Sequence, residues 1–119
     1  MPTPAAHTSW SDLPVEPMNP LLDRQFVSGS QLTVSRITLR KGAHVPMHSH
    51  ANEQVACLLT GCLKFVLEGR EVVLRPDEVL VIPPNVPHEA FALEDTINLD
   101  IFAPPRQDWI SGDDAYLRG

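Results

Sequence analysis

Three histidines and one glutamine stand at positions from which their side chains could bind one metal ion together. His48 and His50 are two residues apart in an expected strand, so their side chains share a face. Gln54 lies four residues after His50, so its side chain points to the same face of a regular strand. Glu53 then points to the opposite face. His88 follows a proline-rich turn, on a strand that can lie beside the first. The alternative is a pair of surface histidines on an edge strand.

A second polar group lies near the end of the last expected strand. Asn98, Asp100 and Phe102 share one face of that strand. Both faces are needed for packing, so an Asp on one of them indicates a polar cavity. Two prolines then separate this strand from Arg106. In the alternative, Asp100 faces solvent and Arg106 is a surface cation.

The charge balance of the chain argues against a nucleic-acid partner. Its 119 residues include 9 Lys and Arg against 15 Asp and Glu, a formal net charge of -6, whereas nucleic-acid domains usually carry a basic face. The apolar runs, such as 55–59, are far shorter than the roughly 20 residues that span a bilayer. Residues 1–7 lack a basic region followed by an apolar core. We therefore expect a cytoplasmic protein without a membrane or nucleic-acid partner.

The spacing of turn residues predicts an all-β, single-domain protein. Residues 1–24 are rich in proline and indicate an extended arm, and residues 25–119 indicate a β-barrel domain with a C-terminal tail. Twelve prolines disfavour long helices. Short β-rich runs at close spacing are typical of an antiparallel sandwich or barrel. The runs are 25–27, 32–39, 45–50, 54–60, 62–67, 70–74, 79–82, 88–93 and 96–102.

Cysteines and aromatic residues are expected to serve packing. Cys57 and Cys62 fit no common zinc pattern, so we interpret both as reduced thiols, as in a cytosolic protein. The tail over residues 108–117 forms a short helix or packs across one end of the barrel. Trp109 and Tyr116 are expected to fix it there.

Two further polar residues, His44 and Arg36, have roles that the pattern leaves open. His44 shares the parity of His48, so it lies beside the metal site or is solvated at the start of its strand. Arg36 falls on the apparent inner face of its strand with Leu32 and Val34. It pairs with a carboxylate inside the barrel, or this assignment of the faces is wrong.

The order of these residues resembles the two motifs of the cupin superfamily over about residues 25–105. In the first motif this chain has Gln54 where the fourth ligand is usually Glu. In the second motif, Asp77 and Asn85 replace the usual glycines, and Ala92 replaces the usual Asn. Asp and Asn tolerate left-handed backbone better than other residues. The matching positions are Gly42, His48, His50, Gln54 and Gly61, then Asp77, Pro83, Asn85 and His88. The resemblance implies a jelly-roll-like antiparallel barrel.

Within the superfamily the chain resembles the small cupins of pectin and alginate breakdown, the KdgF type. Those proteins carry Asp-x-Phe-x3-Arg near the C-terminus, which Asp100, Phe102 and Arg106 match. The resemblance implies a metal held by two His, one Gln and a third His. It implies conversion of 4,5-unsaturated uronic acids to their linear keto form, with Asp100 as proton-transferring acid/base and Arg106 as a carboxylate clamp.

Neutral ligands determine which substrates the expected site favours. Three imidazoles and the Gln54 amide add no negative charge to a divalent ion, so the site should attract a small anionic substrate. The donor set suits Ni, Zn, Fe, Mn or Cu. The alternative is that Glu53 ligates through a bulge and Gln54 only packs.

Other functions remain open from the sequence. An isomerase- or lyase-like enzyme leads, with the metal as Lewis acid on a hydroxyl or enol oxygen. An iron-dependent dioxygenase and a non-enzymatic small-ligand binding module are the alternatives. The exposed edges of a small barrel and an extended arm lead us to expect a homodimer.

Overall fold

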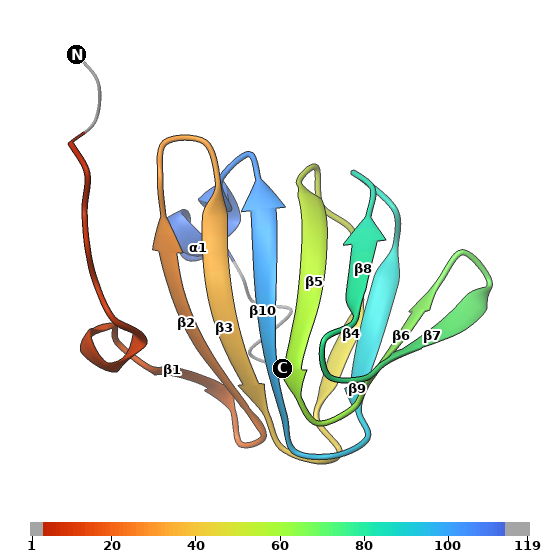
Figure 1. Cartoon of the computed structure of the whole chain (residues 1–119). Coiled ribbons are helices and arrows are strands. Elements are labelled where there is room, and N and C mark those ends of the chain that lie inside the picture. The colour runs from red at the N-terminus through yellow and green to blue at the C-terminus, as the bar shows by residue number, and fades with distance from the viewer. Residues whose placement is uncertain (1–3, 114–119) are drawn as a thin grey trace.

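Two antiparallel sheets face each other across one hydrophobic core (Figure 1). The computed structural model describes residues 4–113. One sheet has the order β1-β2-β3-β10-β5-β8 and the other the order β4-β9-β6-β7. The strands are β1 (Glu16–Asn19), β2 (Leu22–Ser28), β3 (Thr33–Leu39), β4 (His44–His48), β5 (Glu53–Thr60), β6 (Leu63–Leu67), β7 (Arg70–Leu74), β8 (Val79–Ile82), β9 (His88–Ala92) and β10 (Thr96–Ala103). This arrangement confirms the all-β, single-domain, jelly-roll-like barrel.

Alternating burial along the strands builds the core. The inward residues of β6 are Leu63, Phe65 and Leu67, all buried, with half-buried residues between them. Ile37 and Leu39 from β3 meet them from the opposite sheet. The period of two follows from the pleat of a strand.

The sheet begins earlier in the chain than the sequence indicated. The expected boundary between arm and barrel, at residues 24 and 25, falls inside β2, and β1 precedes it. Pro17 concealed β1, because proline disfavours a paired strand in general. It is tolerated here because β1 is the edge of its sheet. Of the described residues, 4–15, with a short 3-10 helix at Trp10–Asp12, remain as an arm beside the barrel.

The assignment of the inner face of β3 was wrong. Arg36 points outward, as do Val34 and Thr38, two residues before and after it. The inward residues of β3 are Thr33, Ser35, Ile37 and Leu39. The apolar residues Leu32 and Val34, on the same side as Arg36, misled the assignment. With apolar residues on both sides, the sequence pattern does not show which side faces the core.

Two turns adopt the left-handed backbone that their sequence indicated. Asp77 has φ 72° and Asn85 has φ 64°, as expected where relatives carry glycine. At Gly61 (φ 91°) an added Cβ would collide with the backbone of Asp95 and Thr96, so only glycine fits this link between the sheets.

The tail contains a short helix, α1 (Gln107–Ser111), which is one of its two expected forms and lies behind β2 and β3 in Figure 1. Residues 114–117 of the expected tail lie outside the described residues. Trp109 is buried and makes edge contacts with Phe26 and Phe102. Tyr116 lies outside the described residues. Cys57 and Cys62 are free thiols. Within residues 4–113, no helix is long and apolar enough to cross a membrane.

Candidate metal centre

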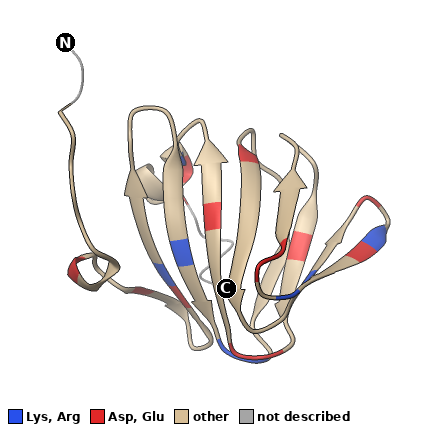
Figure 2. Cartoon of the chain, in the orientation of Figure 1, with Lys and Arg blue, Asp and Glu red and all other residues tan. Residues whose placement is uncertain are grey.

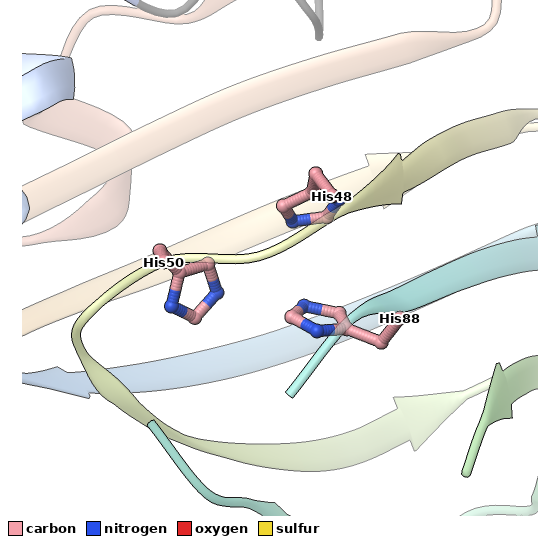
Figure 3. A group of neighbouring side chains, drawn as sticks. All are labelled: His48, His50 and His88. Atoms are coloured by element: carbon pink, nitrogen blue, oxygen red, sulfur yellow. The ribbon is translucent and has the colours of Figure 1, made fainter. Parts of the chain in front are cut away.

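The three histidines of the expected site converge at one end of the barrel (Figure 3). His48 ends β4 and pairs in register with His88, which begins β9. His50 lies in the loop after β4, so it reaches the cluster from outside the strand in which it was expected. One ring nitrogen of each side chain lies within 4.8 Å of one on each of the others. Among the described residues they form the one such group.

Backbone carbonyls fix the direction of each imidazole. The Nδ1 atom of His48 donates to Pro46 O at 2.8 Å, that of His88 to Val86 O at 2.8 Å, and that of His50 to Asn52 O at 3.0 Å. A carbonyl only accepts, so Nδ1 carries the proton and Nε2 of a neutral ring carries a lone pair. The Nε2 atom of His88 is buried and has no hydrogen-bond partner. Such orientation by carbonyl groups is typical of metal-binding histidines.

Burial keeps these rings neutral. It lowers the pKa of His48 and of His50 to about 4, and it also lowers the pKa of His88. The Arg106 guanidinium adds to the effect on all three. At pH 7 the three lone pairs are therefore available to a cation, because protons do not compete for them.

Gln54 adds an oxygen to the cluster. Its side chain is buried as the first inward residue of β5, and its Oε1 lies 3.1 Å from His50 Nε2. Both atoms are acceptors when His50 Nδ1 carries the proton, so a cation between them satisfies both. Glu53 is exposed on the opposite face of β5. The three histidines fit a divalent metal, and of Gln54 and Glu53 only Gln54 lies beside them.

Asp100 holds the Gln54 amide in this orientation. The carboxylate lies on the inward face of β10, where its Oδ1 accepts a hydrogen bond from Gln54 Nε2 at 2.9 Å and another from Asn98 Nδ2 at 2.9 Å. Burial raises the pKa of Asp100 to about 6, although both hydrogen bonds and the charge of Arg106 act against the shift. The residue is thus inside the barrel, as expected.

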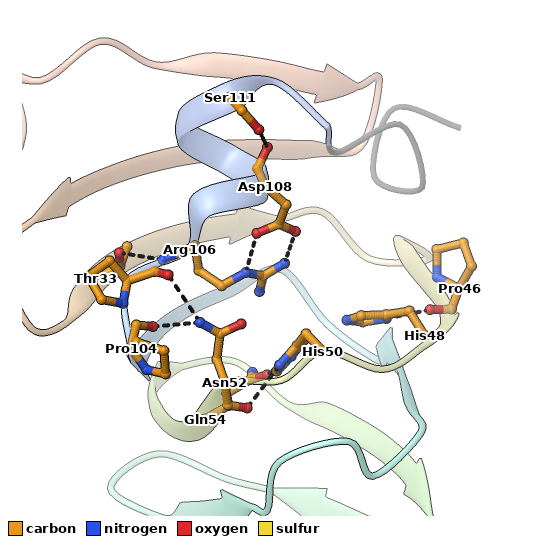
Figure 4. A network of polar contacts seen from close by, with 11 residues as sticks. Thr33, Pro46, His48, His50, Asn52, Gln54, Pro104, Arg106, Asp108 and Ser111 are labelled. Carbon is orange, nitrogen blue, oxygen red and sulfur yellow. Dashed lines mark hydrogen bonds and ion pairs between the residues drawn. The ribbon is translucent and has the colours of Figure 1, made fainter.

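Arg106 stands above this site at the start of α1 (Figure 4). Its side chain is buried, with the guanidinium over the rings of Phe102 at 4.6 Å and Trp109 at 4.3 Å. Asp108 accepts from Nε at 2.8 Å and from Nη2 at 2.6 Å. Burial alone would raise the pKa of Asp108, but these bonds and the charge of Arg106 hold it below its usual value. Arg106 is therefore a buried cation with one acidic partner already in place.

A cavity of about 60 Å³ joins these residues inside the barrel. Its polar lining includes His48, His88, Gln54, Asn98, Asp100 and Arg106. The rest of the lining is apolar and includes Leu39, Leu63 and Phe65. The Oδ1 atom of Asn98 is buried in this lining without a hydrogen-bond partner.

Sequence reasoning missed the residues that support the site. Asn52 accepts from His50 and donates through Nδ2 to Pro104 O, which ties the histidine loop to the chain after β10. The Thr33 hydroxyl accepts from the Arg106 backbone N–H at 3.0 Å. Asp108, two residues after Arg106, could have been found only by predicting the turn of α1.

His44 does not belong to the site. It stacks on Phe91 with 4.4 Å between ring centroids, and its Nε2 lies 2.9 Å from Glu89 Oε2. Its side chain is exposed on the outer surface of the four-stranded sheet. The irregular register between Val45 and His48 separates the faces of the two histidines, so parity counted along a regular strand was misleading.

Comparison with known proteins places this geometry in a family. Residues 35–102 match the cupin domain. The chain is 26% identical over 102 residues to the pectin degradation protein KdgF of Dickeya dadantii (strain 3937), covering 83% of this chain and 93% of that protein.

Two solved structures of cupins are similar to this chain. KdgF from Halomonas sp. is 26% identical, with TM-score 0.78 over 83% of this chain and 94% of that one. An RmlC-like cupin from Shewanella frigidimarina NCIMB 400 is 28% identical, with TM-score 0.81 over 88% of this chain and 96% of that one.

Proposed function

The chain belongs to the cupin family, and from this premise we propose that it is a metal-dependent enzyme that converts a small 4,5-unsaturated uronic acid to its linear keto form. The similarity to pectin degradation proteins of the KdgF type supports the substrate class. One observation carries the proposal: three oriented imidazoles meet, and two of them, His48 and His88, line one cavity with the buried carboxylate of Asp100.

The residues proposed to hold the metal are three neutral histidines and one amide: His48, His50, His88 and Gln54. A divalent transition metal bound there supplies a Lewis acid that polarises a hydroxyl or enol oxygen of the substrate. The four proposed ligands add no negative charge to the ion, so they do not repel an anionic substrate.

Asp100 is the proposed acid/base. The reaction is an isomerisation, so a proton must leave one substrate atom and reach another. Two amides occupy Oδ1 of Asp100, whereas no described side chain donates to Oδ2. Oδ2 is therefore the atom proposed to take and return the proton. A pKa near 6 suits both steps close to neutral pH.

Arg106 and Phe102 are proposed to position the substrate. Arg106 places a buried positive charge at the cavity, where it would attract the substrate carboxylate. Asp108 fixes the guanidinium from one side and Phe102 supports its plane. The Phe102 ring also lines the cavity. The free thiols agree with a cytoplasmic location, which we include in the proposal.

Turnover of unsaturated uronates tests this function. The purified protein is loaded with Ni, Zn, Fe or Mn in turn, and loss of the substrate's ultraviolet absorbance is followed with and without O2. We expect turnover that survives removal of O2 and stops when the metal is chelated. Turnover that needs O2, or tight binding of uronates without turnover, would contradict the proposed isomerisation.

A further inference from the structure

Asn98 carries a buried amide of which only one half has a hydrogen-bond partner. The residue is 2% exposed and belongs to the inward face of β10. Its Nδ2 atom donates to Asp100 Oδ1 at 2.9 Å. Its Oδ1 atom is buried and has no hydrogen-bond partner. Buried polar atoms are nearly always paired, so this exception requires an explanation.

The carboxylate of Asp100 determines which half of the amide is left over. Asp100 is the one charged residue of β10 (Figure 2). An ionised carboxylate accepts hydrogen bonds and donates none. Turning the Asn98 amide over would place its oxygen against the carboxylate oxygen, so that two acceptors would face each other. The oxygen of Asn98 therefore faces away from Asp100.

The side chains opposite Asn98 offer its oxygen no donor. Asn98 pairs in register with Ile37 of β3 and with Leu58 of β5. Both of these side chains are buried and apolar. A leucine at this position would match their layer of the core, whereas the amide brings a polar group into it at a cost in free energy. Packing against the neighbouring strands therefore does not account for the amide.

The amide belongs to the wall of the cavity that the histidines share. Asn98 lines this cavity together with His88 and Asp100. Along β10 it lies two residues before Asp100, on the side away from Phe102, which pairs in register with Gln54. Gln54 and Asn98 thus reach the Asp100 carboxylate from opposite directions along the strand. A ligand that is held at the histidines and extends past Asp100 would meet Asn98 next.

The chemistry of the unpaired atoms indicates what such a ligand must offer. Two buried atoms in the lining, His88 Nε2 and Asn98 Oδ1, have no hydrogen-bond partner. A metal ion satisfies the first, as proposed above. The second needs a hydrogen-bond donor, and a hydroxyl group is one. A buried water would need two to four polar partners, and Ile37 and Leu58 supply none.

We propose that Asn98 is a specificity-determining residue whose Oδ1 atom accepts a hydrogen bond from one ring hydroxyl of the substrate. This inference rests on the proposed function, because it assigns the hydroxyl to a uronic acid. The amide takes no part in the proton transfer and selects the substrate by the position of that hydroxyl. A site built to bond a hydroxyl discriminates against an analogue that lacks it, because the buried acceptor is then left unpaired.

Binding of substrate analogues to Asn98→Leu tests this role. The probes are a saturated 4-deoxy uronic acid, which has no double bond to convert, and analogues of it that each lack one further ring hydroxyl. Calorimetry gives the dissociation constant of each probe for the metal-loaded wild type and variant. We expect one analogue to bind the wild type about tenfold more weakly than the parent acid does. The same analogue should bind Asn98→Leu as tightly as the parent acid does.

The ratio of the two dissociation constants separates this role from a structural one. Loss of the hydrogen bond from Asn98 to Asp100 changes the binding of every probe alike, so it cancels in the ratio. Ile37→Val is the matched control, because it alters the same layer without removing a polar group and should keep the wild-type ratio. A ratio that is the same in Asn98→Leu and in the wild type, for every analogue, would overturn the inference.

A crystal structure of the wild type with the parent acid provides a second test, which holds even if Asn98→Leu folds poorly. We expect a ring hydroxyl within about 3.2 Å of Asn98 Oδ1. A bound acid whose hydroxyls all lie away from this oxygen would overturn the inference and leave the proposed function standing. A wild type that binds none of the probes would count against the proposed function itself, and the inference would fall with it.

Discussion

The two faces of β10 differ in polarity. Their arrangement is the reverse of that in an ordinary surface strand, whose apolar residues face the core. Asn98 and Asp100 point into the barrel, whereas Leu99 and Ile101 point out. Buried polar groups are costly unless they are hydrogen-bonded, and here amide and carboxylate bond one another. An apolar outer side is likewise unfavourable unless something covers it. The difference teaches that polarity alone does not mark the inside of this barrel: β10 turns polar side chains to the cavity and apolar side chains outward.

The largest expected effect comes from removing two inward histidines. The double variant His48→Ala, His50→Ala should lose stoichiometric metal and with it all metal-dependent turnover, because two of the four proposed ligands are gone. Elemental analysis of the purified protein measures the loss. His44→Ala is the matched control: it removes an outward histidine of the same strand and should keep one equivalent. A full equivalent of metal in the double variant would place the site elsewhere.

Replacing the inward carboxylate should affect chemistry more than structure. Asp100→Asn keeps the shape of the side chain and removes the titrating group. We expect kcat to fall about 10² to 10⁴-fold, as for loss of a positioned acid/base, with metal content unchanged. Steady-state kinetics on an unsaturated uronate give the answer. An unchanged kcat would show that Asp100 serves only to orient Gln54.

Neighbouring residues of β5 sharpen the comparison of inner and outer faces. Gln54→Glu should retain metal and raise KM for an anionic substrate, because the added charge offsets that of the ion. Glu53→Gln changes the outward residue and should leave metal content as it is. Loss of metal from Glu53→Gln would identify Glu53 as the ligand.

The smallest expected effect is a pH dependence of the metal-free protein. Unfolded histidines take up protons near pH 6.5, whereas folded His48 and His50 do so only near pH 4. Between these values the unfolded state binds more protons, so the free energy of unfolding should fall as pH falls. Asp100 acts in the opposite direction, because its raised pKa makes the folded state bind more protons between about pH 4 and 6. Chemical denaturation across pH 4 to 7 measures the balance.

The variant His48→Ala, His50→Ala provides the control for this titration. It removes two groups that resist protonation, so its stability should depend less on pH over the same range. Equal slopes for the variant and the wild type would contradict the assigned pKa values.

Local patterns were enough to predict most strands and the three histidines that come together. His48 and His88 fall at strand ends, where turn residues and spacing define them well. His50 was misplaced because its loop is fixed by a contact distant in sequence, from Asn52 to Pro104. Alternation alone does not report such a tertiary bond.

Other features of the molecule lay beyond local pattern. The inner face of β3 was misassigned because the outer face of the sheet is also apolar, so hydrophobicity no longer marks the core. Asp108 was missed as the partner of Arg106, since their contact requires the turn of α1. Both errors concern surfaces or contacts that several elements create together.

Anomalous diffraction from crystals of the metal-loaded protein tests the central claim most directly. We expect a single ion bonded to three Nε2 atoms and one amide oxygen, those of His48, His50, His88 and Gln54. An ion bonded to Glu53, or an ion bound outside this histidine cluster, would contradict it.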